Sequence, residues 1–327
     1  MENIQLAKAR DMGQTIGDPF LFTRHNFKLL FRAYLYYVVP PLLVAAALMI
    51  FGFKGFFERY SQTFNSTGGF NTIGNRSGFA NLGISLVLGY GLFVLISLFQ
   101  QFYVSEFMVL KEDREDVSNS DVLERLKNDW KNIVVSVLFL ILVAVVAIAL
   151  IFLVFASSVY VGTYVSGFTV FLLYLFLLYA MLPLSNFIFI RLREREGVFG
   201  AIAQAFRISS GSWWRTFISF LVVFIVFYSL IILLLIPFYI MVGIVSYHAA
   251  SSGIRPDISS MYLNPVSGVV LTLATFVSFF LQNIITVFVG INYYSLSEKY
   301  SNFHLRKEIN QIGEREDKTV RRQEGEY

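Results

Sequence analysis

Residues 132–190 read NIVVSVLFLILVAVVAIALIFLVFASSVYVGTYVSGFTVFLLYLFLLYAMLPLSNFIFI and contain no Asp, Glu, Lys or Arg. The hydrocarbon core of a bilayer is about 30 Å thick, and a helix crosses it with roughly 20 apolar residues. The stretch is therefore too long for one crossing. Its small and polar segment 157–167 predicts a short loop, so the stretch predicts two spans that cross the membrane in opposite directions.

Four more apolar runs bring the predicted number of spans to six. They lie at 34–53, 82–105, 216–247 and 266–297. The 327 residues are 56% hydrophobic and only 15% charged, whereas soluble domains are about 25% charged. The predicted fold class is all-α, a polytopic membrane protein with six transmembrane helices. This composition excludes a secreted disulfide module, a nucleic-acid-binding domain and most soluble enzymes.

The distribution of Lys and Arg predicts the orientation of these spans. Segments on one side hold 22 of the 26 basic residues and those on the other side hold 4. Because basic loops stay in the cytoplasm, both termini are predicted to be cytoplasmic. The predicted organisation is a cytoplasmic N-terminal segment at 1–33, a six-helix domain at 34–297 and a charged tail at 298–327 that is largely disordered at its end.

The segments that lead into the odd-numbered spans resemble one another. They read HNFKLLFRAYL (25–35), NDWKNIVVSVL (128–138) and SWWRTFISFLV (212–222). Each places an aromatic residue before a cation, a pair that suits the headgroup region because the ring stays at the interface while the cation reaches the phosphates. The alternative is that any cytoplasmic boundary favours such a pair. The predicted membrane-interface anchors are Phe27, Lys28, Trp130, Lys131, Trp213, Trp214 and Arg215.

An amphipathic interfacial helix is predicted before each of these steps. Asp18 and Pro19 suit the start of the first helix, and Ser118 with Asp121 suits a capping box at the start of the second. In the third, residues 198–206 carry an apolar stripe. Helices of this kind lie in the plane of the membrane surface, so the chain is predicted to contain three pseudo-repeated hairpins, each preceded by a cytoplasmic interfacial helix.

The even-numbered spans also end alike, in SEFMVL (105–110), SNFIFI (185–190) and INYYSL (291–296). This layout resembles bacterial six-span membrane proteins of uncharacterised function and, more distantly, the membrane domain attached to some glycerophosphodiester phosphodiesterases. The resemblance implies a multi-pass protein of the bacterial inner membrane. The soluble phosphodiesterase barrel is absent from this sequence, so the resemblance does not imply its hydrolytic activity.

Polar residues inside or at the ends of the spans form the candidate intramembrane site. One interpretation is a polar path or ligand site. The alternative is packing: amides would form hydrogen bonds between helices, worth about 0.6–2 kcal/mol each, and the one carboxylate, Glu106, would pair with Lys111 or a loop arginine. The candidate residues are Gln100, Gln101, Glu106, Asn186, Gln282, Asn283 and Asn292.

No catalytic motif and no acid pair within a span is found, and the chain has no Cys. A charge at the bilayer centre costs about 2.5–3.5 kcal/mol on insertion scales and is kept mainly for function. We therefore predict no catalytic residue, cofactor or metal. The leading hypothesis is a non-catalytic scaffold or accessory subunit of a membrane complex. Its predicted partners are the lipid bilayer and other membrane proteins, which it would contact through loops 111–131 and 191–215. No nucleic-acid partner is predicted. The alternatives are a transporter or channel for a small solute or lipid, and a lipid-headgroup enzyme that uses Glu106.

Overall fold

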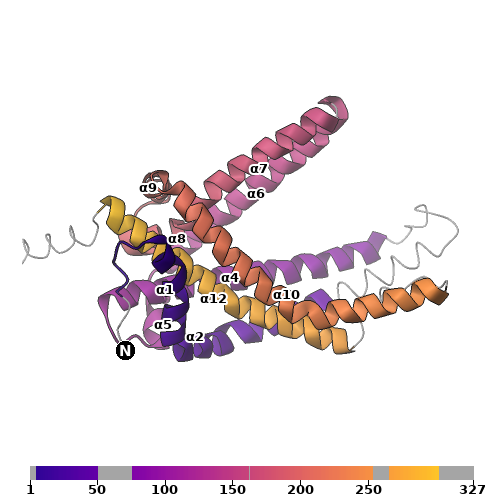
Figure 1. Ribbon diagram of the computed structural model, residues 1–327, viewed down its shortest axis with the longest axis horizontal. Coiled ribbons are helices and arrows are strands. Elements are labelled where there is room, and N and C mark those ends of the chain that lie inside the picture. Colours follow the sequence, from indigo (N-terminus) through magenta and orange to yellow (C-terminus); the bar gives the residue numbers. More distant parts are fainter. Residues whose placement is uncertain (1–4, 51–75, 162, 253–264, 302–327) are drawn as a thin grey trace, which may run out of the picture. The chain divides into compact units, whose positions relative to one another are not determined.

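A computed structural model describes residues 5–50, 76–161, 163–252 and 265–301, and these segments form helices and no strand (Figure 1). Six of the helices are long and apolar enough to cross a membrane, which confirms the predicted all-α polytopic fold. The six candidate spans are Phe27–Ile50, Ile84–Asp113, Trp130–Ala156, Gly167–Glu194, Trp213–Ile244 and Val269–Tyr300.

The spans are built from long helices and the segments between them carry short ones. The first span consists of α2 (Phe27–Ala33), the π-helical turn η1 (Tyr34–Val38) and a helical continuation to residue 50. The other five contain α4 (Arg76–Asp113), α6 (Trp130–Val161), α7 (Thr163–Ser185), α10 (Trp213–Ser252) and α12 (Pro265–Ser301). The short α8 (Phe187–Phe189) and the π-helical turn η3 (Ile190–Glu194) follow α7. Three further helices precede odd-numbered spans: α1 (Met12–His25), α5 (Asn119–Asn128) and α9 (Val198–Ser210).

The break predicted at 157–167 does separate the third and fourth spans, which end at Ala156 and begin at Gly167, but the predicted length of the loop is wrong. α6 continues to Val161 and α7 begins at Thr163, so only position 162 lies outside the described helices. A helix pairs its backbone N–H and C=O groups internally, so both helices continue past the span ends at Ala156 and Gly167 in spite of the weak helix preference of the small and polar residues there.

The predicted start of the first interfacial helix is also wrong. α1 begins at Met12, which places Asp18 and Pro19 inside the helix. Asp18 does not cap the helix; its carboxylate accepts a hydrogen bond from Nε of Arg10 at 2.7 Å. Pro19 is buried in the helix.

The capping box predicted for the second short helix is present at the start of α5. Ser118 N donates to Oδ2 of Asp121 at 2.9 Å, and Asp121 N donates to Oγ of Ser118 at 3.4 Å. The Ser118 backbone N–H stabilises the carboxylate and holds the pKa of Asp121 below its usual value. Val122 and Leu126 are the buried residues of α5.

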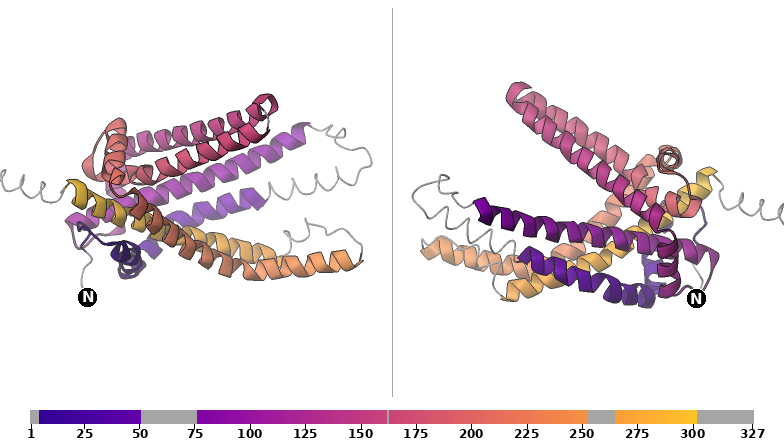
Figure 2. Two further views of the ribbon diagram at one scale, coloured as in Figure 1. Left: turned by 45° about the horizontal axis from the view of Figure 1, so that its top comes forward. Right: turned by 180° about the vertical axis from the view of Figure 1, so that it is seen from behind.

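The helices group into two compact units, each formed by distant segments of the chain. Unit 1 contains the chain up to Arg24, Phe102–Val222 and the chain from Ile285. Unit 2 contains His25–Gln101 and Val223–Ile284. Within unit 1, α6 and α7 run side by side as a hairpin in every view of Figures 1 and 2.

Unit 2 has an apolar core between the first, second and sixth spans. Tyr34, Leu42 and Ile96 are buried there and pack with the rings of Phe279 and Phe280. The Tyr34 hydroxyl donates to the Phe276 carbonyl oxygen at 2.6 Å, which satisfies the polar end of an otherwise apolar side chain.

The core of unit 1 lies where the even-numbered spans end. Met108 of α4 and Phe189 of α8 are almost fully buried, and both press against Gly290 of α12. A Cβ at position 290 would lie 2.6 Å from Cζ of Phe189 and 2.7 Å from Sδ of Met108. Any side chain at position 290 would force Phe189 or Met108 to move, so glycine is the residue that fits this packing.

Candidate functional site

An ion cluster of Glu112, Arg193 and Glu298 joins the ends of α4, η3 and α12. Arg193 donates to both carboxylate oxygens of Glu112, from Nε at 2.9 Å and from Nη2 at 2.6 Å. Nη2 of Arg193 also lies 3.8 Å from Oε1 of Glu298. The side chains of Arg193, Glu112 and Glu298 are only 3%, 7% and 13% exposed. The fork-to-fork geometry is the strongest form of this ion pair.

Aromatic rings and hydroxyls complete the surroundings of Arg193. Its guanidinium lies over the rings of Tyr293 and Tyr294, at 5.6 Å and 4.6 Å from their centroids. Its Nη1 donates to Oγ of Ser297 at 3.2 Å, and the Tyr293 hydroxyl donates to Oε1 of Glu194 at 2.7 Å. Cation–π contact and paired carboxylates together offset the desolvation of the buried charge.

Glu106 is fully buried in the structure, at 0% exposure, although its place at a span boundary predicts nearby water. Its Oε1 forms an ion pair with Nε of Arg125 in α5. The two charged groups are in contact, but their geometry is not that of a hydrogen bond. The partner is thus an arginine of the 106–131 segment, as the packing alternative expects.

Asn186 and Asn292 occupy corresponding positions at the ends of the fourth and sixth spans, and both are buried. Asn186 Nδ2 donates to Oγ of Ser209 in α9 at 3.3 Å. Neither Oδ1 nor Nδ2 of Asn292 has a hydrogen-bond partner among the described residues. Asn292 is therefore the polar side chain of the candidate site that the surrounding protein leaves most completely unsatisfied.

The deeper amides of the candidate site belong to unit 2. Gln100 Nε2 donates to Oδ1 of Asn283 at 2.7 Å and to the Phe279 carbonyl oxygen at 2.6 Å. Gln282 Nε2 donates to Oγ of Ser97. Gln101, in contrast, is only partly buried. These bonds link α4 to α12 and are the interhelical hydrogen bonds of the packing alternative.

The residues predicted as interface anchors differ in exposure. Phe27, Trp130 and Trp214 are 46%, 55% and 70% exposed, and Lys28 and Lys131 are also exposed. The remaining two anchors are more buried. Trp213 donates from Nε1 to the Tyr179 carbonyl oxygen at 3.2 Å, and Arg215 is only partly exposed and points into the protein.

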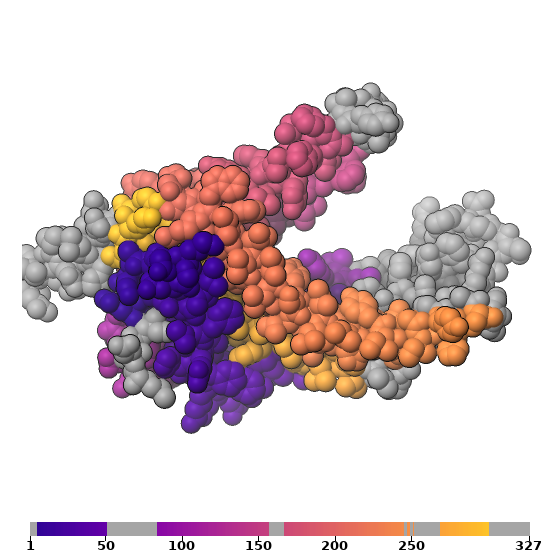
Figure 3. Space-filling model, viewed as in Figure 1, coloured from indigo at the N-terminus to yellow at the C-terminus, as the bar shows by residue number. Residues whose placement is uncertain are grey.

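A second polar group is formed by Arg10, which precedes α1, Arg215 of α10 and Ser295 of α12. Arg10 N donates to Oγ of Ser295 at 3.0 Å. Arg215 donates to the Arg10 carbonyl oxygen at 3.1 Å and to Oγ of Ser295 at 3.3 Å. Figure 3 shows the indigo N-terminal segment against the yellow end of α12.

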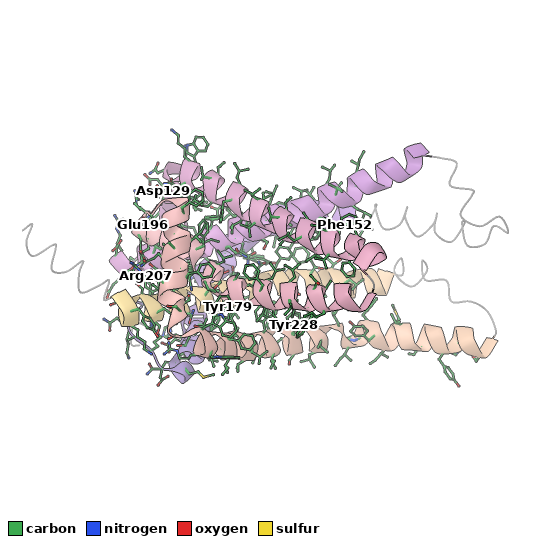
Figure 4. All side chains as sticks on the ribbon, turned by 90° about the horizontal axis from the view of Figure 1, so that it is seen from above. Asp129, Phe152, Tyr179, Glu196, Arg207 and Tyr228 are labelled. Atoms are coloured by element: carbon green, nitrogen blue, oxygen red, sulfur yellow. The ribbon has the colours of Figure 1, made fainter. Side chains whose placement is uncertain are left out.

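Sequence reasoning missed the ion cluster and the buried Arg191. Nε of Arg191 donates to Oγ of Ser136 at 3.1 Å, which ties η3 to the start of α6. Asp129, Glu196 and Arg207 lie at this same end of unit 1, far from Phe152 on α6 (Figure 4). One signal was available: Arg191 and Arg193 directly follow an apolar run that is too long for one span.

No group of three or more His, Asp or Glu side chains in the described segments is arranged to hold a metal ion. Among the charged side chains near the ends of the spans, Glu106, Glu112, Arg193 and Glu298 are held in ion pairs. No family model, curated protein or solved structure matches the chain, so its function has to be argued from its own residues.

Proposed function

We propose that the chain is a non-catalytic integral membrane protein that serves as a scaffold or accessory subunit of a membrane complex. The observation that carries this proposal is the ion cluster. Arg193 uses its donors on Glu112, Ser297 and Glu298, so these charges, whose side chains are almost fully buried, hold helices together. A catalytic site would instead keep a charged group free for substrate.

A scaffold also needs a surface that its partner can reach, and α9 offers one. Ala201, Ala205 and Ile208 face the protein and are buried. Phe199, on the opposite side of the helix, is 85% exposed. An exposed aromatic residue on a short helix outside the spans suits contact with a partner or with the headgroup region. Loops 111–131 and 191–215 remain the proposed partner surfaces.

The proposed topology places these surfaces in the cytoplasm of a bacterium, with the spans in its inner membrane. Two contacts support the proposed threefold repeat. Glu106 pairs with Arg125 and Asn186 bonds to Ser209. Arg125 and Ser209 each lie five positions before the Trp of an aromatic-cation pair. In both cases the polar end of an even-numbered span is fastened to the following short helix.

Site-specific photo-crosslinking in native membranes tests the scaffold proposal. A crosslinking amino acid at Phe199 should yield one adduct of defined mass, and the same partner should co-purify in mild detergent. Phe152 on α6 is a matched control because it is 73% exposed but lies within a span. Identical adducts from both positions, or only abundant membrane proteins, would count against the proposal.

Transport is the second candidate, and the amides of unit 2 are its proposed site. Gln282 and Asn283 already bond to Ser97 and Gln100, which favours packing. If they also line a path, replacing both with Leu should abolish solute flux in proteoliposomes while the protein still folds. For the lipid-headgroup enzyme, Glu106→Gln should abolish turnover. Full retention of flux or of turnover contradicts the corresponding proposal.

A further inference from the structure

We propose that α10 and α12 form a binding site for a phosphate-type oxyanion, built from Arg215, Thr216, Asn292 and Ser295. All four residues lie in unit 1. The proposal does not depend on a scaffold function, because it rests on side chains that face the interior of the protein. Three observations carry it: an arginine without a carboxylate, a buried amide without a partner, and the register that brings them together.

Arg215 carries a charge that the described residues do not neutralise. Its two hydrogen bonds go to neutral acceptors, the Arg10 carbonyl oxygen and the Ser295 hydroxyl. Among the inward-facing arginines, Arg10 and Arg193 each have a carboxylate partner. Arg191, like Arg215, bonds to neutral acceptors, but three of them surround its guanidinium. A partly buried guanidinium gains most from an anion that accepts two N–H groups at once, as a carboxylate or a phosphate does.

Asn292 supplies the second observation. It is 1% exposed, and neither its amide oxygen nor its amide nitrogen has a hydrogen-bond partner among the described residues. A buried polar group left unpaired is costly, and such a group in a native protein calls for an explanation. A ligand that both donates and accepts hydrogen bonds would satisfy this side chain.

The register of the two helices places Thr216 opposite Asn292. The rings of Phe220 and Phe288 meet with centroids 4.8 Å apart, and Arg215 reaches Ser295 further along. The two helices are therefore antiparallel. Thr216 precedes Phe220 by four positions and Asn292 follows Phe288 by four, so each lies one turn away on the same face.

Thr216 has the same unsatisfied character as Asn292. It is 1% exposed, and its Oγ1 has no hydrogen-bond partner in the described part of the chain. Ser295 lies three positions after Asn292, about one helical turn nearer to Arg215. The site thus combines a cation, two hydroxyls and one amide between two helices.

This set of groups fits a phosphoryl group that also carries a hydroxyl. Arg215, Thr216 and the amide nitrogen of Asn292 are donors for the oxyanion, while the amide oxygen of Asn292 needs a donor. Hydrogen phosphate supplies one through its own P–O–H, and a glycerol headgroup supplies one through its hydroxyls. The adjacent Trp214 is 70% exposed and suits headgroup depth, so the phosphate could belong to a lipid or to a soluble ion.

Thermal unfolding of the full chain in neutral detergent tests the site and separates the two sources. One arm compares sodium phosphate with sodium chloride at equal ionic strength. The other compares added phosphatidylglycerol with phosphatidylcholine. The proposal expects a rise in the unfolding midpoint in at least one arm. A rise in the phosphate arm identifies a soluble ion, and a rise only with phosphatidylglycerol identifies a headgroup.

Two variants and a matched control decide whether the effect belongs to this site. Arg215→Gln should weaken the apparent affinity at least tenfold, and Arg207→Gln, which removes an exposed arginine bonded to Gln204, should not. Asn292→Leu should remove the ligand-dependent shift. Because it deletes an unpaired buried amide, it should also raise the midpoint without ligand, by about 2–4 °C.

Asn292→Leu is expected to be stabilising, so the test remains informative if Arg215→Gln fails to fold. In that case Arg215→Lys, which keeps the charge but loses the forked guanidinium, should show a smaller ligand-dependent rise in the unfolding midpoint. The proposal is overturned if neither arm shifts the wild-type protein. It is equally overturned if the shift survives in both site variants at wild-type strength.

Discussion

Arg193 and Glu112 lie 81 positions apart in the chain and form a two-pronged ion pair, with N–O distances of 2.9 Å and 2.6 Å. Both side chains are almost fully buried. The pair fastens η3 to the end of α4, and Glu298 adds α12 to the same cluster. Three spans that are distant in sequence are thus held together by one guanidinium.

Removing this guanidinium should be strongly destabilising. Arg193→Gln leaves the carboxylates of Glu112 and Glu298 buried without their cation, and we expect the free energy of unfolding to fall by about 3–5 kcal/mol. Unfolding in a mixed-micelle SDS titration measures it. Arg195→Gln is the control, because Arg195 is 65% exposed where it meets Asp129 at 3.5 Å and should cost no more than about 1 kcal/mol. Equal losses in the two variants would contradict a structural role for the cluster.

The Glu106–Arg125 pair should show a different pattern. Breaking a buried pair leaves an uncompensated charge, whereas replacing both partners with apolar residues is often neutral or stabilising. We therefore expect Arg125→Met, which leaves the buried Glu106 carboxylate without its cation, to lower the free energy of unfolding by about 3 kcal/mol, and Arg125→Met combined with Glu106→Met to restore most of the loss. The same titration measures both. If the double variant is as unstable as the single variant, the loss of stability does not come from an uncompensated charge, and this explanation of the pair is contradicted.

Gly290 should tolerate no side chain. In Gly290→Ala the new Cβ would lie 2.6 Å from Cζ of Phe189, and overpacking of this kind costs about 1–3 kcal/mol. Gly91→Ala in α4 is the matched control, because nothing lies within 4 Å of its Cβ position, and a helical Gly→Ala change is otherwise favourable by up to about 1 kcal/mol. The midpoint of thermal unfolding should fall for Gly290→Ala and rise for Gly91→Ala. A higher midpoint for Gly290→Ala would contradict this expectation and would show that α12 can shift away.

The capping box of α5 should respond to acid. The pKa of Asp121 is lower in the folded protein than its ordinary value of about 3.9. Its contribution is therefore present above that ordinary value and is lost as the pH falls through the lower folded value. Hydrogen exchange of residues 119–128, compared between the wild type and Asp121→Asn from pH 6 to pH 3, should show a protection difference that disappears at the acid end. A difference that grows on acidification would refute this role of the carboxylate.

The spans and the capping box were predictable because they depend on local sequence. A run of about twenty apolar residues predicts one crossing of the bilayer. A Ser three positions before an Asp predicts a capping box within a single helical turn. The length of the loop at 157–167 was misjudged for the same reason: its residues disfavour a helix locally, but backbone hydrogen bonding carries both helices past the ends of their spans.

The ion cluster could not be predicted from local pattern, since its members come from three different spans. A weak signal existed in the spacing. The cluster residues follow the three polar-aromatic pairs by six, seven and six positions, and the extra position occurs in the copy that contains η3. A π-helical turn adds one residue to a helix. The pairing of Asn186 with Ser209 and the isolation of Asn292 required the packed structure.

The position of Arg193 in the chain bears on how the protein is made. Synthesis proceeds from the N-terminus, so Arg193 and Glu112 enter the membrane well before Tyr293, Tyr294 and Glu298. Until the sixth span arrives, the guanidinium lacks its two aromatic neighbours and one of its carboxylates. The last described helix therefore completes the electrostatic surroundings of an earlier one, and a nascent chain halted before α12 would expose an incompletely neutralised charge to the quality-control proteases of the membrane.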